Sequence, residues 1–220
     1  MHCDLIAEKL FRKYYSFTGE KVTAQDVKNC RNHRFAGDNY WKIWKEYGEF
    51  FGFIEGFFHV MDGTNQFYKI PEKERQIFQS SGNLLKNFQN CAQLLEYFLE
   101  NGIKRLASIH ANRIFLASSR IENDFHGCVP KDFETLLTFD GYGRKIANMV
   151  MNLVFDIPRI AIDVRVFRSA VNLELVPASF ADMGKFPKYR LLAEEILHQK
   201  FAKSIFLIEM DYLLFSHGEG

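Results

Sequence analysis

The segment whose residues could best do chemistry runs from Thr138 to Val150 and reads TFDGYGRKIANMV. Two glycines one residue apart, Gly141 and Gly143, are typical of a turn that leads from one helix into the next. The backbone N–H groups of such a turn, and of the helix behind it, point outward and can bind a phosphate. Lys145 would then lie in the first turn of that helix, so the sequence predicts an amine beside an anion site.

Three interpretations of this glycine pair compete. A dinucleotide-binding fingerprint fails, because its third glycine would fall on Ile146 and no strand pattern precedes the motif. A purely structural turn between helices remains, as does a helix–hairpin–helix that binds the DNA backbone. Downstream, Asp163 follows Lys145 by 18 residues, after a short extended run. Asp163 suits the N-cap of the next helix, whichever interpretation holds.

The elements that must position these residues are predicted to be helices, because apolar residues recur every three or four positions through most of the chain. Only the run 159–162 reads as extended, and it is too short for a sheet. The sequence therefore predicts an all-α fold of many short helices. The predicted helices are Leu5–Tyr15, Asp38–Met61, Glu72–Ser80, Asn83–Asn101, Ile103–Ile109, Ala111–Phe125 and Lys131–Leu137.

The helix predicted at Asp38–Met61 carries a stripe of aromatic side chains that is interrupted by Gly48, Gly52 and Gly56. Such a stripe could stack on nucleobases. We expect it instead to be the buried face of a core helix, because its spacing is what a broad buried face needs. The glycines lower the helix propensity of the segment.

Composition excludes several classes of protein. The chain has 220 residues, of which 47% are hydrophobic, enough for one large domain or two small ones. Lys and Arg number 28 against 27 Asp and Glu, so any nucleic-acid contact must rest on a local basic face. No apolar run is long enough to cross a membrane, and the amino end lacks the pattern of a signal peptide. We expect an intracellular protein of the cytoplasm or nucleoid that contacts no membrane.

Metal and disulfide chemistry also find no support in the sequence. The four cysteines form no CxxC pair, and the seven histidines form no HExxH motif. We therefore expect no zinc site and no disulfide framework. The cysteines are Cys3, Cys30, Cys91 and Cys128.

The hairpin and the aspartate together resemble the helix–hairpin–helix, Gly/Pro-Asp (HhH-GPD) superfamily of DNA glycosylases, and look most like its endonuclease III branch. That branch reads LPGVGRKTANxV at the hairpin and [IV]AVDTH[VI]xR at the aspartate, with the same 18-residue interval. Upstream, residues 127–132 and 103–120 are also similar, as are residues 211–218 near the end, whereas residues 1–94 show no resemblance. The matching residues are Gly141, Gly143, Arg144, Lys145, Ala147, Asn148, Val150, Ala161, Asp163, Phe167 and Arg168.

Three departures from the family pattern stand out. Asp140 replaces the hairpin proline, which should loosen the turn, and Val164-Arg165 replaces Thr-His after the aspartate. The sequence ends at Gly220, where the four-cysteine motif of the iron–sulfur cluster would begin. Because none of the cysteines present could replace that motif, we expect no iron–sulfur cluster and no other cofactor.

The resemblance implies a helical bundle in two subdomains with a cleft between them. A central subdomain would span residues 62–157 and contain the helix–hairpin–helix at about 131–154. Residues 1–61 and 158–220 would form the second subdomain. The implied activity is that of a bifunctional DNA glycosylase and AP lyase of base excision repair. Its implied partner is double-stranded DNA with a damaged base or an abasic site, bound by a monomer.

The resemblance also assigns roles to residues. Lys145 would form a Schiff base with the sugar, and Asp163 would accept a proton and stabilise the developing cation. The hairpin amides at Gly141 and Gly143 would bind one phosphate, and the hairpin carbonyls would hold an alkali cation. Arg144, Arg165 and Arg168 are further candidates for DNA contact, and the alternative for each is an exposed position on a solvated helix face. Ile109 or His110 could fill the space of the flipped nucleotide, and the alternative for both is packing in the core. The Asp62–Gln66 loop is another candidate for DNA contact.

The sequence leaves three functional alternatives open. The endonuclease III likeness favours oxidised pyrimidines, but aromatic walls could also sandwich 8-oxoguanine. The hairpin could serve a non-catalytic DNA-binding module, although that role does not call for both Lys145 and Asp163. An α-helical protein–protein adaptor built on the aromatic helix is the third alternative.

Overall fold

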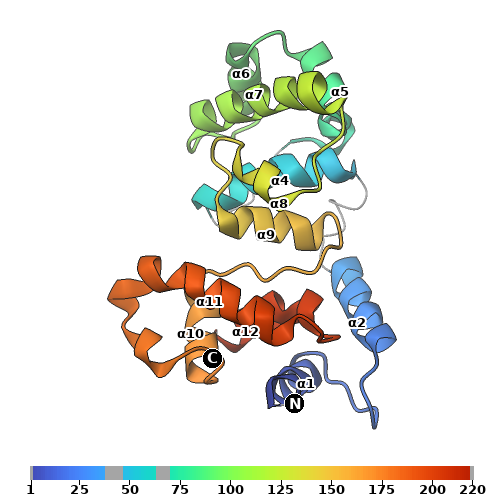
Figure 1. Ribbon diagram of the computed structural model, residues 1–220. Helices are drawn as coiled ribbons and strands as arrows, with labels where there is room; N and C mark the ends of the chain where they lie inside the picture. Colours follow the sequence, from blue (N-terminus) through green and yellow to red (C-terminus); the bar gives the residue numbers. More distant parts are fainter. Residues whose placement is uncertain (1, 38–46, 63–69, 219–220) are drawn as a thin grey trace. The chain divides into compact units, whose positions relative to one another are not determined.

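The computed structural model describes residues 2–37, 47–62 and 70–218, and all its regular structure in these ranges is helical (Figure 1). No strand occurs among the described residues, which confirms the predicted all-α class. The segment at 157–163, which contains the run predicted to be extended, adopts no helix. No helix in the described part of the chain is both long and apolar enough to span a membrane.

The chain divides into two compact units. We call residues 39–155 the central unit, and residues 1–38 with 156–220 the terminal unit. The sequence assigned residues 1–61 to the terminal part, but of these the described residues 47–61 belong to the central unit. The physical reason is that α4 (Glu49–Asp62) packs against α9 (Arg144–Leu153), which carries the residues that follow the hairpin.

The terminal unit has a core of apolar side chains contributed by both ends of the chain. Phe11, from near the amino end, is fully buried, as are Phe167 and Met210 from near the carboxyl end. The Arg31 guanidinium lies 2.9 Å from the Glu209 carboxylate in the same core. The helices of this unit are α1 (His2–Tyr14), α2 (Ala24–Gly37), α10 (Val164–Asn172), α11 (Phe186–Phe201) and α12 (Met210–His217), joined by short 3-10 turns η3 (Ala178–Ala181), η4 (Met183–Lys185) and η5 (Leu207–Glu209).

The central unit packs α6 (Cys91–Glu100) against α7 (Ala107–Phe125), and it places both α4 and α8 (Phe133–Leu137) beside α9 (Figure 1). The aromatic stripe of α4 is part of its core, since Phe53, Phe57 and Phe58 are all buried. The expectation of a buried helix face is thus confirmed for these residues, whereas residues 38–46 lie outside the described part. The remaining elements are η2 (Glu72–Phe78) and α5 (Ser81–Asn87).

The structure divides the predicted helices differently in two places. The single helix predicted at 83–101 is two helices, because Asn90 caps α6 with hydrogen bonds from the backbone N–H groups of Ala92 and Gln93. The break predicted at His110 is wrong, since α7 continues through it. His110 and Ala111 lie on the buried face of α7, so packing favours a continuous helix there.

The glycines of α4 have a packing role. A Cβ at Gly52 would lie 2.6 Å from Val154 Cγ2, and one at Gly56 would lie 2.6 Å from the Tyr142 hydroxyl. Because the two glycines are four residues apart, they share one face of the helix. That face allows the backbone of α4 to approach α9 and the hairpin closely. The glycines that weaken the helix pattern in the sequence therefore fix the position of the hairpin.

Candidate active site

The hairpin connects α8 to α9, and the first of its two glycines, Gly141, cannot be replaced by another residue without strain. Gly141 has φ +89°, a conformation that side chains with a Cβ rarely adopt. A Cβ there would also meet three atoms of the Arg113 side chain, each at 2.9 Å. Both the positive φ and the closeness of the Arg113 side chain therefore require glycine at position 141.

Neither the backbone conformation nor the neighbouring atoms require a glycine at Gly143, the second glycine of the hairpin. Gly143 is the N-cap residue of α9, with φ −88° and ψ 168°, which any residue can adopt. No atom lies within 4 Å of the position that its Cβ would occupy, and no side chain caps the helix. The effect of glycine is to leave the amino end of α9 uncovered, where helix N–H groups and the helix dipole favour an anion.

Tyr142, between the two glycines, anchors the hairpin. Its side chain is buried, its ring stacks on Phe53 at 4.8 Å, and its hydroxyl donates a hydrogen bond to the Phe53 carbonyl. Burial raises the pKa of the Tyr142 phenol well above its usual value. The Tyr142 hydroxyl thus stays neutral and holds the turn against α4, while Gly143 is exposed.

Basic side chains surround this turn. Lys145 lies in the first turn of α9 and is half-buried, and the Arg144 guanidinium lies 4.8 Å from the Phe133 ring centroid. From α7, Arg120 donates a hydrogen bond to the Thr138 carbonyl at 3.1 Å. Arg113, also from α7, pairs with Asp140 at 3.1 Å. Four basic side chains thus lie around the turn, and two of them, Arg113 and Arg120, are ion-paired with Asp140 and Asp124.

Asp163 begins α10 in the terminal unit. Its Oδ1 atom accepts hydrogen bonds from the backbone N–H groups of Arg165, at 2.8 Å, and Val166, at 2.9 Å. The N-cap expected from the sequence is confirmed. The extended segment before it is held by α11, because the N–H group of Ile160 donates to His198 Nε2 at 3.0 Å. Asp163 itself is half-buried.

The structure places the two residues predicted to be catalytic in different units. Lys145 belongs to the central unit and Asp163 to the terminal unit. Their approach across a cleft therefore stays a prediction. Arg165 and Arg168, both exposed on α10, also belong to the terminal unit, and the Arg165 guanidinium lies 4.9 Å from the Phe215 ring centroid.

The two candidates for filling the space of a flipped nucleotide differ in exposure. His110 is fully buried, with its ring 4.4 Å from that of Phe58, so it packs in the core. Ile109 is 40% exposed. Both lie in the first turn of α7 rather than in the predicted loop between two helices, and residues 63–66 of the other candidate loop lie outside the described residues.

Sequence reasoning missed two residues of this site. Arg113 contacts the hairpin from 27 positions away, and no local pattern signals such a contact. Tyr142 could have been found, because a large apolar ring between two turn glycines must either pack inward or be exposed at the tip. The structure shows that it packs inward.

The cysteines do not fit an iron–sulfur cluster. Cys3 and Cys30 lie in the terminal unit, Cys91 and Cys128 lie in the central unit, and all four are free thiols. Among the described residues, no group of three or more His, Cys, Asp or Glu side chains could hold a metal ion.

Comparison with known proteins supports the resemblance. The endonuclease III of Rickettsia felis is 31% identical over 121 residues, which cover 52% of this chain and 56% of the relative. That of Escherichia coli K12 is 28% identical over 130 residues, covering 54% of this chain and 56% of the relative. The chain thus spans about half the length of these curated relatives. No protein-family model matches the chain.

Solved structures show the same fold at low identity. A trapped endonuclease III–DNA covalent intermediate aligns with a TM-score of 0.56 and 18% identity, over 89% of this chain and 85% of that chain. A thermostable thymine-DNA glycosylase aligns with a TM-score of 0.56 and 19% identity, over 80% of this chain and 77% of that chain. The chain thus shares the fold of these two proteins. Together with the sequence similarity to endonuclease III proteins, this shared fold confirms the resemblance to the HhH-GPD superfamily.

Proposed function

We propose that this protein is a bifunctional DNA glycosylase and AP lyase of base excision repair, which acts as a monomer on double-stranded DNA. The observation that carries the proposal is the position of Lys145. It is the second residue of α9, the helix that follows the glycine hairpin, and no side chain caps the amino end of that helix. A phosphate-binding turn needs no such lysine. The similarity to endonuclease III proteins and to a trapped endonuclease III–DNA covalent intermediate supports the same chemistry.

The hairpin would bind the DNA backbone. The N–H groups at the start of α9 offer hydrogen bonds to one phosphate, and Gly143 lets that phosphate approach without meeting a side chain. Arg144 would add positive charge beside the turn, whereas the charges of Arg113 and Arg120 are balanced by Asp140 and Asp124. Because these contacts read no base, binding should be independent of sequence and sensitive to salt.

Lys145 and Asp163 would perform the reaction on a nucleotide flipped out of the duplex. The Lys145 amine would attack C1′ of the sugar while the bond from C1′ to the base breaks, and Asp163 would accept the amine proton. The base leaves with the bonding electron pair and takes up a proton from the solvent. Before the attack is complete, the Asp163 carboxylate stabilises the positive charge on the sugar. Opening of the sugar gives a Schiff base to Lys145. Loss of a proton from C2′ then expels the 3′ phosphate and cuts the strand.

The proposed substrate class is DNA with oxidised pyrimidines, which the similarity to the endonuclease III branch favours. Ile109 is the proposed side chain for the space left by the flipped nucleotide, because it is exposed at the start of α7 whereas His110 is buried.

Reductive trapping tests this function. Borohydride adds hydride to the C=N bond of a Schiff base and leaves a stable protein–DNA adduct. We expect an adduct between the wild type and a duplex with an oxidised pyrimidine, and none with Lys145→Ala. Lys86→Ala is the matched control, since it removes an exposed lysine of α5 and should give the wild-type yield. The proposal fails if the wild type gives no product with oxidised pyrimidines, 8-oxoguanine or abasic sites.

A further inference from the structure

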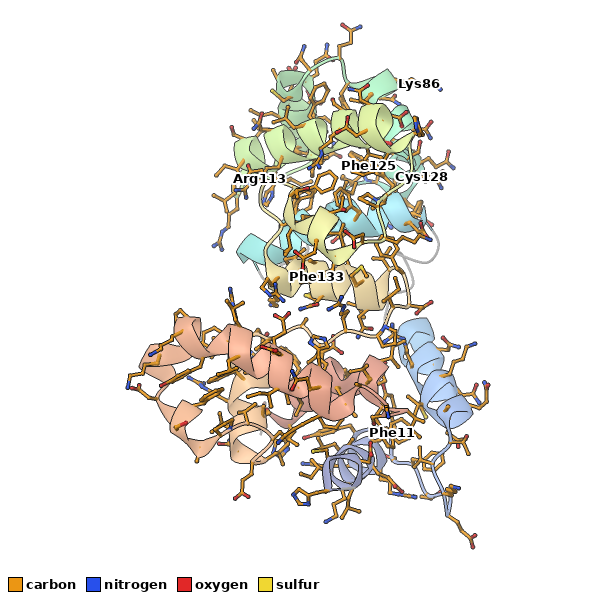
Figure 2. The ribbon with its side chains drawn as sticks, viewed as in Figure 1. Phe11, Lys86, Arg113, Phe125, Cys128 and Phe133 are labelled. Carbon is orange, nitrogen blue, oxygen red and sulfur yellow. The ribbon has the colours of Figure 1, made fainter. Side chains whose placement is uncertain are left out.

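An ion pair lies against the hairpin turn. Arg113 Nε donates a hydrogen bond to Asp140 Oδ2 at 3.1 Å, and a second guanidinium nitrogen lies 3.5 Å from Oδ1. The Cδ, Nε and Cζ atoms of Arg113 are each 2.9 Å from the position of a Cβ on Gly141. The side chain therefore lies flat against the glycine as well as facing the carboxylate. Figure 2 labels Arg113 on α7, within the central unit.

Asp140 creates a difficulty for a turn that binds phosphate. Its side chain is 76% exposed and immediately precedes Gly141, so a negative charge lies next to the proposed phosphate site. Two like charges a few ångströms apart in water weaken binding by a factor on the order of five. An aspartate also lacks the fixed φ with which a proline would stiffen the turn.

We propose that Arg113 is a positioning residue that compensates for both defects. Its guanidinium, only 22% exposed, neutralises Asp140 and fixes the turn against α7. In this arrangement the hairpin keeps its affinity for a DNA phosphate although the turn carries an acid. This inference rests on the proposed function, because the anion it concerns is the DNA backbone.

The signature of such a pair is a dependence of one residue on the other. Removing Arg113 alone takes away a cation and also leaves the Asp140 charge unpaired beside the phosphate. Removing the charge of Asp140 alone removes a repulsion but also breaks the pair that fixes the turn, so the two effects offset each other and binding should change little. Removing both takes away the cation without leaving the unpaired acid. The Asp140→Asn change should therefore help binding much more when Arg113 is absent than when it is present.

A double-mutant cycle on the full chain tests this dependence. The dissociation constant would be measured for a duplex with a stable abasic-site analogue, for the wild type, Arg113→Ala, Asp140→Asn and the double variant. We expect Arg113→Ala to weaken binding about 20-fold and the double variant to recover at least threefold of that loss. Lys86→Ala, which removes one cation from α5, should stay within about twofold of the wild type.

Several results would overturn the inference. One is an Asp140→Asn effect of the same size in both backgrounds, and another is an Arg113→Ala loss no larger than that of Lys86→Ala. If Arg113→Ala does not fold by circular dichroism, Arg113→Gln keeps the stem of the side chain and is expected to give the same cycle. A wild type that binds and is trapped on DNA while the cycle is additive refutes this inference alone. A wild type that binds no DNA refutes the proposed function as well.

Discussion

Asp163 combines a structural role with the proposed chemical one, and substitutions can separate the two. As the N-cap of α10, it accepts two backbone hydrogen bonds through a single oxygen atom, Oδ1. An asparagine supplies an equivalent oxygen and ranks with aspartate as a capping residue. Asp163→Asn therefore keeps the cap and removes only the negative charge, whereas Asp163→Ala removes both.

The expected magnitudes differ enough to be distinguished. Loss of the cap in Asp163→Ala should cost about 1 kcal/mol of unfolding free energy, and Asp163→Asn should cost less than about 0.5 kcal/mol. A protein with at least about 5 kcal/mol of stability stays almost wholly folded after such a loss. We expect both variants to slow base release by a factor on the order of 10³, because both lack the charge that stabilises the transition state.

The assay is single-turnover base release, measured beside urea unfolding and DNA affinity for each variant. Asp132 provides a matched control, since it caps α8 by accepting the Thr135 N–H at 2.8 Å. Asp132→Ala should lose similar stability and keep base release within about twofold. The catalytic role of Asp163 is refuted if Asp163→Asn retains more than a tenth of the wild-type rate. It is also refuted if DNA affinity falls as far as the rate.

Two further predictions concern the central unit. Gly52→Ala and Gly56→Ala should each lower the unfolding free energy, measured by urea titration, by about 1–3 kcal/mol, because the added methyl groups meet Val154 and Tyr142. An unchanged unfolding free energy would show that α4 and α9 are not in close contact. Because burial raises the pKa of Tyr142 above that of an unfolded tyrosine, near 10, the unfolded state loses its proton first as the pH rises. The unfolding free energy should be unaffected below about pH 9 and should fall above about pH 10, by up to about 1.4 kcal/mol per pH unit for this group. Tyr142→Phe should reduce that slope, and an unchanged slope would contradict the assignment.

The sequence predicted those parts of the site that local chemistry determines. The glycine pair was expected to turn the chain from one helix into the next and does so, with a positive φ at Gly141 but not at Gly143, and Asp163 was expected to cap a helix and does so. Both signals reside in a few consecutive residues. Arg113 could not be predicted in this way, because its contact with Asp140 depends on how α7 packs beside the turn.

The positions where helices begin and end show the same difference between features that the local sequence determines and features that tertiary contacts determine. Asn90 lies within a continuous helical pattern, so the sequence predicts one helix there. The structure has two helices, because the Asn90 side chain accepts hydrogen bonds that cap the second. The break expected at His110 rested on polar residues in sequence, but burial of His110 against Phe58 favours an uninterrupted helix. Tertiary packing decided both cases.

The division of the terminal unit between the two ends of the chain has a consequence for synthesis on the ribosome. The central unit is complete once residue 155 has emerged, so it can fold while translation continues. Helix α1 packs against α12, and its apolar residues Leu10 and Phe11 must wait for that partner. The nascent chain thus exposes the apolar face of α1 until α12 has been synthesised, and we expect that face to be a site where chaperones bind.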